Sequence, residues 1–345
     1  MAGFKTFGTS IVYPPSIDSR VRDVGAAHVW RATSTEDPTR QFWCDEDGMR
    51  SWHSRPLSDE ENREGLSRAR QLLVRARTPE VVESVVSLVH CGVLAAYPDL
   101  QQNTETALVY ELDDPRWAGG TQSPIDPVRC WDQADIGVRA AAAAWSDTSA
   151  VYALQKYRFS LERDWFTPHS ADPIHRDVFA YKYDDPRSQV SAAFSIVAAY
   201  SVIEELGLEV RSSQQRPRFL NGTPQWNPEV LSDLNRRLEA AGIPSTTTIA
   251  WLHRGARTRV EREMSPSLGV PADWSRRYEV RDKELLIADA IHYVSWLRNF
   301  VAAHKFRALA SEVSPYDPHN AQAVARRLLL GYLGLWDYLL ARVSA

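Results

Sequence analysis

Long segments with helical spacing of apolar residues dominate the C-terminal half of this 345-residue chain, and they constrain its fold more than any other feature. Capping residues support this prediction: Asn227 and Pro228 stand where one segment begins, and Gly207 and Gly242 stand where two of them end. Because long amphipathic helices with short or medium connections pack together, we expect a helical bundle over residues 188–345. The predicted helices cover residues 188–206, 227–241, 246–263, 283–312 and 317–343.

The first 97 residues have a different pattern. Residues 1–57 mix short apolar runs with Pro, Gly, Asp and Ser, which predicts strands and turns. Residues 58–97 predict two helices. The first starts with Ser-Asp-Glu-Glu, which is typical of a capping box, and runs to about Arg77. The second has Pro79 in its first turn and must end before Pro98.

These patterns predict a mainly α protein in three parts. Residues 1–134 form an N-terminal mixed α/β or α+β region, to which we assign a sensing or regulatory role as a hypothesis. Residues 135–187 hold one helix, which runs to about Trp165, and a connection rich in proline and acidic residues. Residues 188–345 form the helical bundle.

Composition narrows the class of protein. Hydrophobic residues make up 44% and charged residues 24% of the chain, which is typical of a folded soluble protein. The N-terminal sequence has neither the basic start nor the apolar stretch of a signal peptide, so we expect a cytoplasmic protein without a membrane partner. The net charge of −4 disfavours a generally basic surface but leaves a local basic cleft open. Three cysteines far apart fit neither a disulfide framework nor a zinc cluster, and are interpreted as buried thiols: Cys44, Cys91 and Cys130.

The segment SWLRNFVAAHKF places an arginine, an asparagine and a histidine in an otherwise apolar helical stretch. His304 continues the apolar stripe of this predicted helix and therefore faces the core, where a hydrogen-bonded structural histidine is one interpretation. Arg298 lies roughly 120° around the helix from His304 and about 9 Å along its axis. The stripe before His304 consists of Leu286, Ala290, Tyr293, Leu297 and Phe300.

Two other Arg and His pairs have the same spacing, in RDVGAAH (Arg22 and His28) and RDWFTPH (Arg163 and His169). A glycine in the first and a proline in the second interrupt the helix that each would need. Only Arg298 is followed directly by asparagine, a match that chance rarely produces in a chain with seven asparagines.

The heptamer RNFVAAH resembles the R-N-x4-H signature of the HEPN superfamily, whose helical domains include many metal-independent ribonucleases. The upstream sequence AAYSVIEELGLEV resembles the first helix of such a domain, and the resemblance covers residues 188–345. It implies an endoribonuclease that acts as a homodimer with a composite active site. It also implies a setting in antiphage defence, abortive infection or a toxin-like system, with RNA, a second copy of the chain and a regulatory protein or phage trigger as partners.

The chemistry of RNA cleavage fits these residue types. The 2′-hydroxyl of RNA is the nucleophile, so cleavage without a metal ion needs a proton acceptor, a proton donor and compensation of the phosphorane charge. His304 suits the proton transfers, Arg298 the charge, and Asn299 the orientation of either group. On one helix the side chains of Arg298 and His304 point in different directions. Two copies of this helix across a two-fold axis would bring both residue types to one cleft, so a dimer would complete the site better than one chain.

Other residues near this segment have a functional and a structural interpretation. Glu204 could pair with Arg298, or remain a solvated acid at a helix end. Trp296 could stack on an unpaired base or pack in the core. The candidate contacts to the RNA backbone, which could instead form a solvated helical face, are Arg254, Arg257 and Lys305.

Other chemistries have weaker support. The sequence contains no phosphate-binding loop, zinc-protease or serine-hydrolase motif. The segment PHSADPIHRD over residues 168–177 has the composition of a metal site, but its prolines favour a turn-forming connection, and we expect no metal or other cofactor. The alternative functions are a catalytically inactive HEPN-like assembly or nucleotide-sensing module, and a purely structural helical protein.

Overall fold

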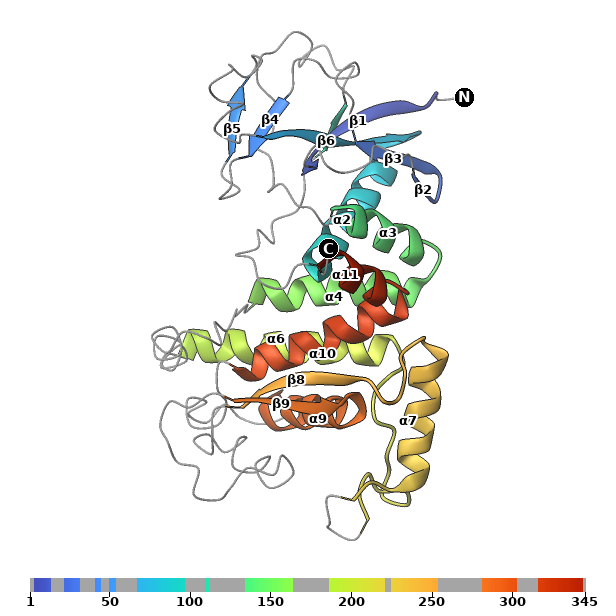
Figure 1. Cartoon of the computed structure of the whole chain (residues 1–345), viewed down its shortest axis with the longest axis vertical. Coiled ribbons are helices and arrows are strands. Elements are labelled where there is room, and N and C mark those ends of the chain that lie inside the picture. The colour runs from blue at the N-terminus through green and yellow to red at the C-terminus, as the bar shows by residue number, and fades with distance from the viewer. Residues whose placement is uncertain are drawn as a thin grey trace. The chain divides into compact units, whose positions relative to one another are not determined.

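The computed structural model describes residues 3–13, 22–31, 41–44, 50–53, 67–96, 109–111, 134–163, 186–220, 225–253, 281–302 and 316–343. The described part contains eight helices and nine strands, which confirms a mainly α protein with some strands (Figure 1). The helices are α2 (Pro79–Ala96), α3 (Ala134–Ala144), α4 (Thr148–Arg163), α6 (Pro186–Glu205), α7 (Pro228–Ala240), α9 (Ile287–Ala302), α10 (Tyr316–Tyr332) and α11 (Trp336–Val343). The strands are β1 (Lys5–Tyr13), β2 (Arg22–Val24), β3 (Ala27–Arg31), β4 (Gln41–Cys44), β5 (Arg50–His53), β6 (Ser67–Ala76), β7 (Val109–Glu111), β8 (Thr248–His253) and β9 (Arg281–Leu286).

The chain forms two compact units, residues 1–151 and 152–345, and the boundary falls within α4. The first unit contains an antiparallel sheet of seven strands in the order β2-β3-β6-β1-β7, with β4 beside β6 and β5 beside β4. The strands predicted over residues 1–57 are therefore confirmed where the structure describes them.

Strand β6 corrects the helix predicted over residues 58–77, of which residues 58–66 lie outside the described part. This strand pairs with β1 on one side and with β3 on the other. Its residues Leu72, Leu73 and Val74 are all buried, so apolar side chains lie on both faces of the sheet. A continuous apolar run of this kind fits a buried strand as well as a helix, and partners distant in the sequence decide between them.

The helix α2 begins at Pro79 and ends at Ala96, which confirms the second helix predicted in this region. It packs closely on α3 through two glycines. A Cβ atom added at Gly92 would lie 2.6 Å from Ala140 Cβ, and one added at Gly137 would lie 2.6 Å from the carbonyl oxygen of Val89. This contact makes α3 part of the first unit.

Helix α2 is also the one described helix long and apolar enough to cross a membrane by length and composition. About two thirds of it (67%) is buried inside the fold, and Cys91 is among its buried residues, as expected for that thiol. The core helix of a folded domain can have the same length and composition, and the burial of α2 is that of a core helix.

The single helix predicted from Asp135 to about Trp165 is two helices, α3 and α4. The reason is local: the Asp147 carboxylate accepts hydrogen bonds from Ser149 N (2.9 Å) and Ala150 N (3.2 Å), so it caps a new helix. In the same way, the helix predicted over residues 317–343 is interrupted after Tyr332, where Gly334 adopts a positive φ of 67°.

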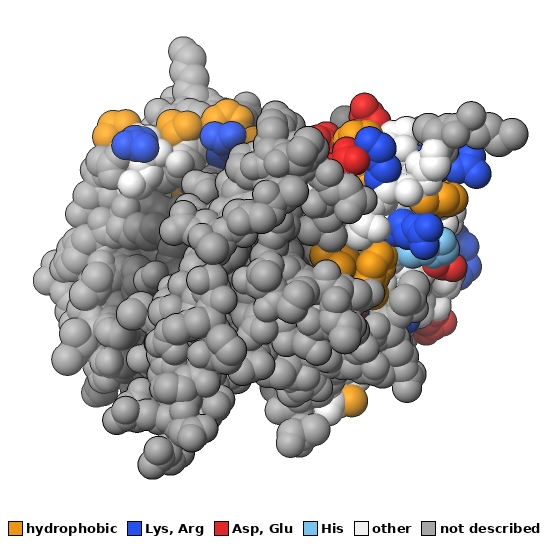
Figure 2. All heavy atoms as spheres, turned by 90° about the horizontal axis from the view of Figure 1, so that it is seen from above, with side chains coloured by type: hydrophobic (Ala, Val, Ile, Leu, Met, Phe, Trp, Pro, Cys, Tyr) orange, Lys and Arg blue, Asp and Glu red, His pale blue; other side chains and the backbone are white. Residues whose placement is uncertain are grey.

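An exposed cluster lies near the N-terminus on one face of the first unit. The Phe4 ring is 41% exposed and lies beside the guanidinium carbons of Arg75 (5.8 Å) and Arg77 (5.3 Å) and beside the ring of His28 (6.0 Å). His28 also contacts the Asp23 carboxylate. Figure 2 shows positive, negative and hydrophobic side chains close together on this face. Arg22 and His28 lie on paired strands, so this pair does not lie on one helix.

The second unit is built around α6 and α10, which lie side by side, with α9 against both (Figure 1). A buried polar contact joins the helices α4, α6 and α10. Gln322 Nε2 donates to Ser160 O (3.1 Å) and to Ser195 Oγ (2.9 Å), and Ser195 Oγ donates to Ser160 O (3.0 Å).

The capping predictions in this unit are confirmed. Gly207 ends α6 with a φ of 68°, and Gly242 follows α7 with a φ of 72°. The Asn227 side chain accepts from Glu229 N at 3.0 Å and caps α7.

The hairpin of β8 and β9 corrects two predictions, a helix over 246–263, of which residues 254–263 lie outside the described part, and a helix starting at 283. The two strands pair over their whole length, and α9 begins only at Ile287. The Asn320 side chain of α10 accepts from Leu252 N (2.9 Å) and donates to Leu252 O (2.8 Å). This contact satisfies the N–H and the carbonyl of Leu252 in β8. A local sequence pattern cannot reveal it, because 68 residues separate the two partners.

Candidate functional site

Arg298 lies in the last described turns of α9, where its guanidinium makes three contacts. Arg298 Nη1 donates to Asn299 Oδ1 at 2.8 Å, and Arg298 Nη2 lies 3.7 Å from Glu204 Oε1 of α6. The guanidinium carbon lies 5.6 Å from the centre of the Tyr200 ring. The side chains of Arg298 and Glu204 are 40% and 41% exposed, so both remain accessible to a solvent-borne anion.

The structure therefore places Arg298, Asn299 and Glu204 together. Of the two interpretations of Glu204, the pairing with Arg298 is the one observed. Trp296 is half-buried on α9. The other candidates lie outside the described residues: His304, Arg254, Arg257 and Lys305. The metal-like segment over residues 168–177 lies wholly outside the described residues, and of the pair Arg163 and His169 only Arg163 is described.

Next to Arg298 lies a polar cluster that the sequence did not reveal, formed by Arg218, His292 and Ser295. Arg218 Nη1 contacts His292 Nδ1, and Arg218 Nη2 donates to Ser295 Oγ at 3.1 Å. Since a guanidinium only donates, His292 Nδ1 must accept, and the imidazole proton is then on Nε2. This contact requires the neutral form of His292.

The surroundings of His292 favour the same neutral form. Burial and then the Arg218 cation lower the pKa of His292 from 6.5 to about 3. At neutral pH His292 is therefore uncharged, so it cannot act as an imidazolium general acid. Its Nδ1 atom instead accepts from Arg218.

Aromatic rings surround the imidazole on a short hairpin between α6 and α7. Phe219 and Trp226 form its bridge, and their rings lie 4.6 Å and 5.8 Å from the His292 ring in edge-on orientation. Trp226 Nε1 donates to Asp289 Oδ1 at 2.6 Å, which fixes the hairpin to α9.

Tyr200 connects the Arg218 cluster with Arg298. Its ring lies beside the Arg298 guanidinium, and its hydroxyl interacts with Ser295, the residue to which Arg218 donates. Burial raises the pKa of Tyr200, while the Ser295 contact and Arg218 act in the opposite direction. The hydroxyl therefore stays protonated at neutral pH.

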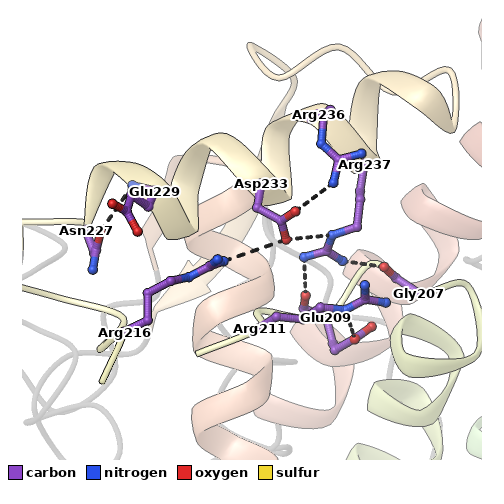
Figure 3. A network of polar contacts seen from close by, with 9 residues as sticks. All are labelled: Gly207, Glu209, Arg211, Arg216, Asn227, Glu229, Asp233, Arg236 and Arg237. Atoms are coloured by element: carbon purple, nitrogen blue, oxygen red, sulfur yellow. Dashed lines mark hydrogen bonds and ion pairs between the residues drawn. The ribbon is translucent and has the colours of Figure 1, made fainter. Parts of the chain in front are cut away.

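A second polar network holds the segment that carries Arg218 (Figure 3). Arg237 of α7 donates to the carbonyl oxygens of Gly207 and Glu209, the latter at 2.9 Å, and to Asp233 Oδ2 at 3.1 Å. Asp233 in turn lies 4.0 Å from Arg216, two residues before Arg218. Arg236 and Arg237 lower the pKa of Asp233 through hydrogen bonds and charge, so this carboxylate stays ionised.

A signal for part of this site was present in the sequence. Asp289, His292, Trp296 and Asn299 recur at spacings of three and four residues, so they form a polar stripe beside the apolar one. No local pattern identifies Arg218 as their neighbour, because 74 residues separate it from His292.

Within the described residues, no group of three or more His, Cys, Asp or Glu side chains is placed to hold a metal ion. The arrangement can bind an anion through two guanidiniums next to aromatic rings. No family model, curated protein or solved structure matches the chain.

Proposed function

We propose that the chain is a metal-independent endoribonuclease of HEPN type. The observation that supports this proposal most is the placement of Arg298. Its guanidinium is oriented by Asn299 and Glu204 and remains 40% exposed, as a residue that meets a phosphodiester from solvent should be.

In the proposed reaction the 2′-oxygen of RNA attacks the adjacent phosphorus and gives its proton to a base. The bond from phosphorus to the 5′-oxygen breaks, and that oxygen takes a proton from an acid. The products are a 2′,3′-cyclic phosphate and a 5′-hydroxyl. His304 is the proposed proton-transfer residue, and Arg298 stabilises the charge of the phosphorane.

The proposed active unit is a homodimer with a composite site. The described imidazole on α9, His292, is engaged by Arg218 and held neutral, so it is not the proposed proton-transfer group. The imidazole then has to come from His304 of either copy. In this proposal the chain works in the cytoplasm in antiphage defence, abortive infection or a toxin-like system, and the N-terminal unit senses a trigger or restrains cleavage.

One observation favours the alternative, a catalytically inactive nucleotide-sensing module. The two guanidiniums and the aromatic rings of Phe219 and Trp226 form an anion-binding and stacking surface that needs no proton transfer. Such a protein would bind nucleotides and leave RNA intact.

Purified protein incubated with mixed RNA in EDTA separates the two proposals. We expect wild type to cleave, and Arg298→Ala and His304→Ala to lose about 10²-fold or more in rate. Arg236→Ala is the matched control, because this arginine is 72% exposed on α7 and should cleave as wild type does. Equal cleavage by all four proteins would exclude this site. A wild-type protein that binds RNA without cleaving it would support the sensing module.

A further inference from the structure

Arg218 is a half-buried cation, and its partners among the described residues carry no negative charge. It contacts the neutral imidazole of His292 and the hydroxyl of Ser295, and among the described residues no carboxylate forms an ion pair with it. Taking a guanidinium even partly out of water without a counter-ion costs free energy, and proteins normally pair such a group. The missing charge therefore points to a ligand.

The carboxylates nearest to this cluster have other contacts. Asp289 accepts from the Trp226 indole at 2.6 Å, and Glu209 pairs with Arg211 at 2.6 Å. Glu204 lies nearest to Arg298, and this exposed pair has a separation of 3.7 Å. Exposed pairs of this kind are weak, so a stronger anion can replace Glu204 at Arg298.

We propose that Arg218 and Arg298 together bind one phosphate group of an RNA strand, with Tyr200 and Ser295 between the two guanidiniums. The identity of the ligand as RNA rests on the proposed function, whereas the anion site rests on the contacts above. Among the described residues, the contacts with His292 and Ser295 use two of the five N–H donors of Arg218.

The aromatic neighbours make a nucleotide a better ligand than a bare anion. Phe219 and Trp226 are half-buried, and their rings lie next to the imidazole that Arg218 contacts. Aromatic rings beside a phosphate site offer a stacking surface to an unpaired base. A single strand fits this arrangement, because the bases of a duplex are already stacked.

The test uses a fluorescein-labelled 2′-O-methyl oligoribonucleotide, which has no free 2′-hydroxyl and so reports binding without cleavage. We expect Arg218→Gln and Arg298→Gln each to weaken binding about ten-fold or more. Each should also lower the slope of log K against log salt by about one unit. Arg77→Gln is the matched control, since this arginine is exposed after strand β6 in the first unit and contacts none of the site residues described above, so the variant should bind as wild type does.

The double variant tests whether both arginines bind one phosphate. If they do, its loss of affinity is smaller than the product of the two single losses. Binding by Arg218→Gln equal to that of wild type and of Arg77→Gln overturns the proposal. Should Arg218→Gln fail to fold, Arg298→Gln decides: pyrophosphate should raise the melting temperature of wild type, and the absence of such a rise, or an equal rise in Arg298→Gln, overturns it.

Cleavage of unmodified RNA by the same proteins keeps the two proposals apart. Binding that depends on Arg218 in a protein without nuclease activity supports the phosphate site, and favours the sensing module over a nuclease that is active without a trigger. If wild type cleaves RNA and Arg218→Gln binds the oligonucleotide as tightly as wild type does, the enzyme is supported and the phosphate site is refuted.

Discussion

The neutral state of His292 predicts how the stability of the protein depends on pH. The pKa of this imidazole is 6.5 as a free side chain and about 3 in the folded protein. Between these values the unfolded chain binds a proton that the folded chain does not. The free energy of unfolding must therefore fall as the pH falls from about 6.5 toward 3, and it is unaffected by His292 at higher pH.

The magnitude follows from the two pKa values. At pH 5 the unfolded side chain is protonated almost completely, 1.5 pH units below its pKa, while the folded side chain is neutral. Each pH unit corresponds to about 1.4 kcal/mol, so His292 alone should lower the free energy of unfolding by about 2 kcal/mol between pH 7 and pH 5. The origin is physical: protonation of Nδ1 removes the acceptor for Arg218 and places two cations in contact.

The assay compares wild type with His292→Asn, because the Asn Oδ1 atom can take the place of the imidazole Nδ1 as an acceptor. Urea unfolding is measured for both proteins at pH 7 and at pH 5. All other titrating groups are shared, so the difference between the two proteins isolates His292. We expect wild type to lose about 2 kcal/mol more than His292→Asn over this range.

Two results would refute the reasoning. If both proteins lose the same free energy between pH 7 and pH 5, the imidazole is not held neutral by the fold. If the histidine NMR signals of folded wild type show every imidazole titrating near 6.5, the contact with Arg218 does not require the neutral form.

Three further predictions concern packing and charge. Gly137→Ala should lower the free energy of unfolding by about 1 to 3 kcal/mol in thermal unfolding because it overpacks the α2 and α3 contact, whereas Gly3→Ala, with open space around it, should be neutral. Asn320→Ala should cost about 2 to 4 kcal/mol in urea unfolding, since it leaves a buried N–H and a buried carbonyl of β8 without their partner. Glu204→Gln should change stability by less than about 1 kcal/mol. It should also tighten RNA binding in fluorescence anisotropy, because the carboxylate that competes for Arg298 is removed, and weaker binding would contradict this.

The parts of the fold that sequence could predict are those set by local chemistry. Asn227, Gly207 and Gly242 act within one turn of their own helix, so their roles were readable from the sequence and are confirmed. The strands β6, β8 and β9 were wrongly predicted as helical, because an apolar run does not show its partners. For β8 the deciding contact is Asn320, 68 residues away in the sequence.

The same division applies to the candidate site. The sequence identified Arg298 and Asn299 because they are adjacent in the heptamer RNFVAAH. It identified Glu204 because this residue belongs to the segment that resembles the first helix of a HEPN domain. Arg218 could not be found, since its importance comes from burial beside His292 and from the lack of a carboxylate partner among the described residues. Neither property has a local signature.

The guanidinium of Arg218 changes how tightly the proposed site can bind a phosphate. One exposed arginine paired with Glu204 would bind a phosphate weakly, because the ligand competes with a carboxylate that is always present. Arg218 has no such competitor among the described residues, and the network of Arg237 and Asp233 holds its segment in place before any ligand arrives. A preorganised, half-buried cation loses little entropy on binding. Affinity for the phosphate should therefore depend more on Arg218, and the charge compensation during cleavage more on Arg298.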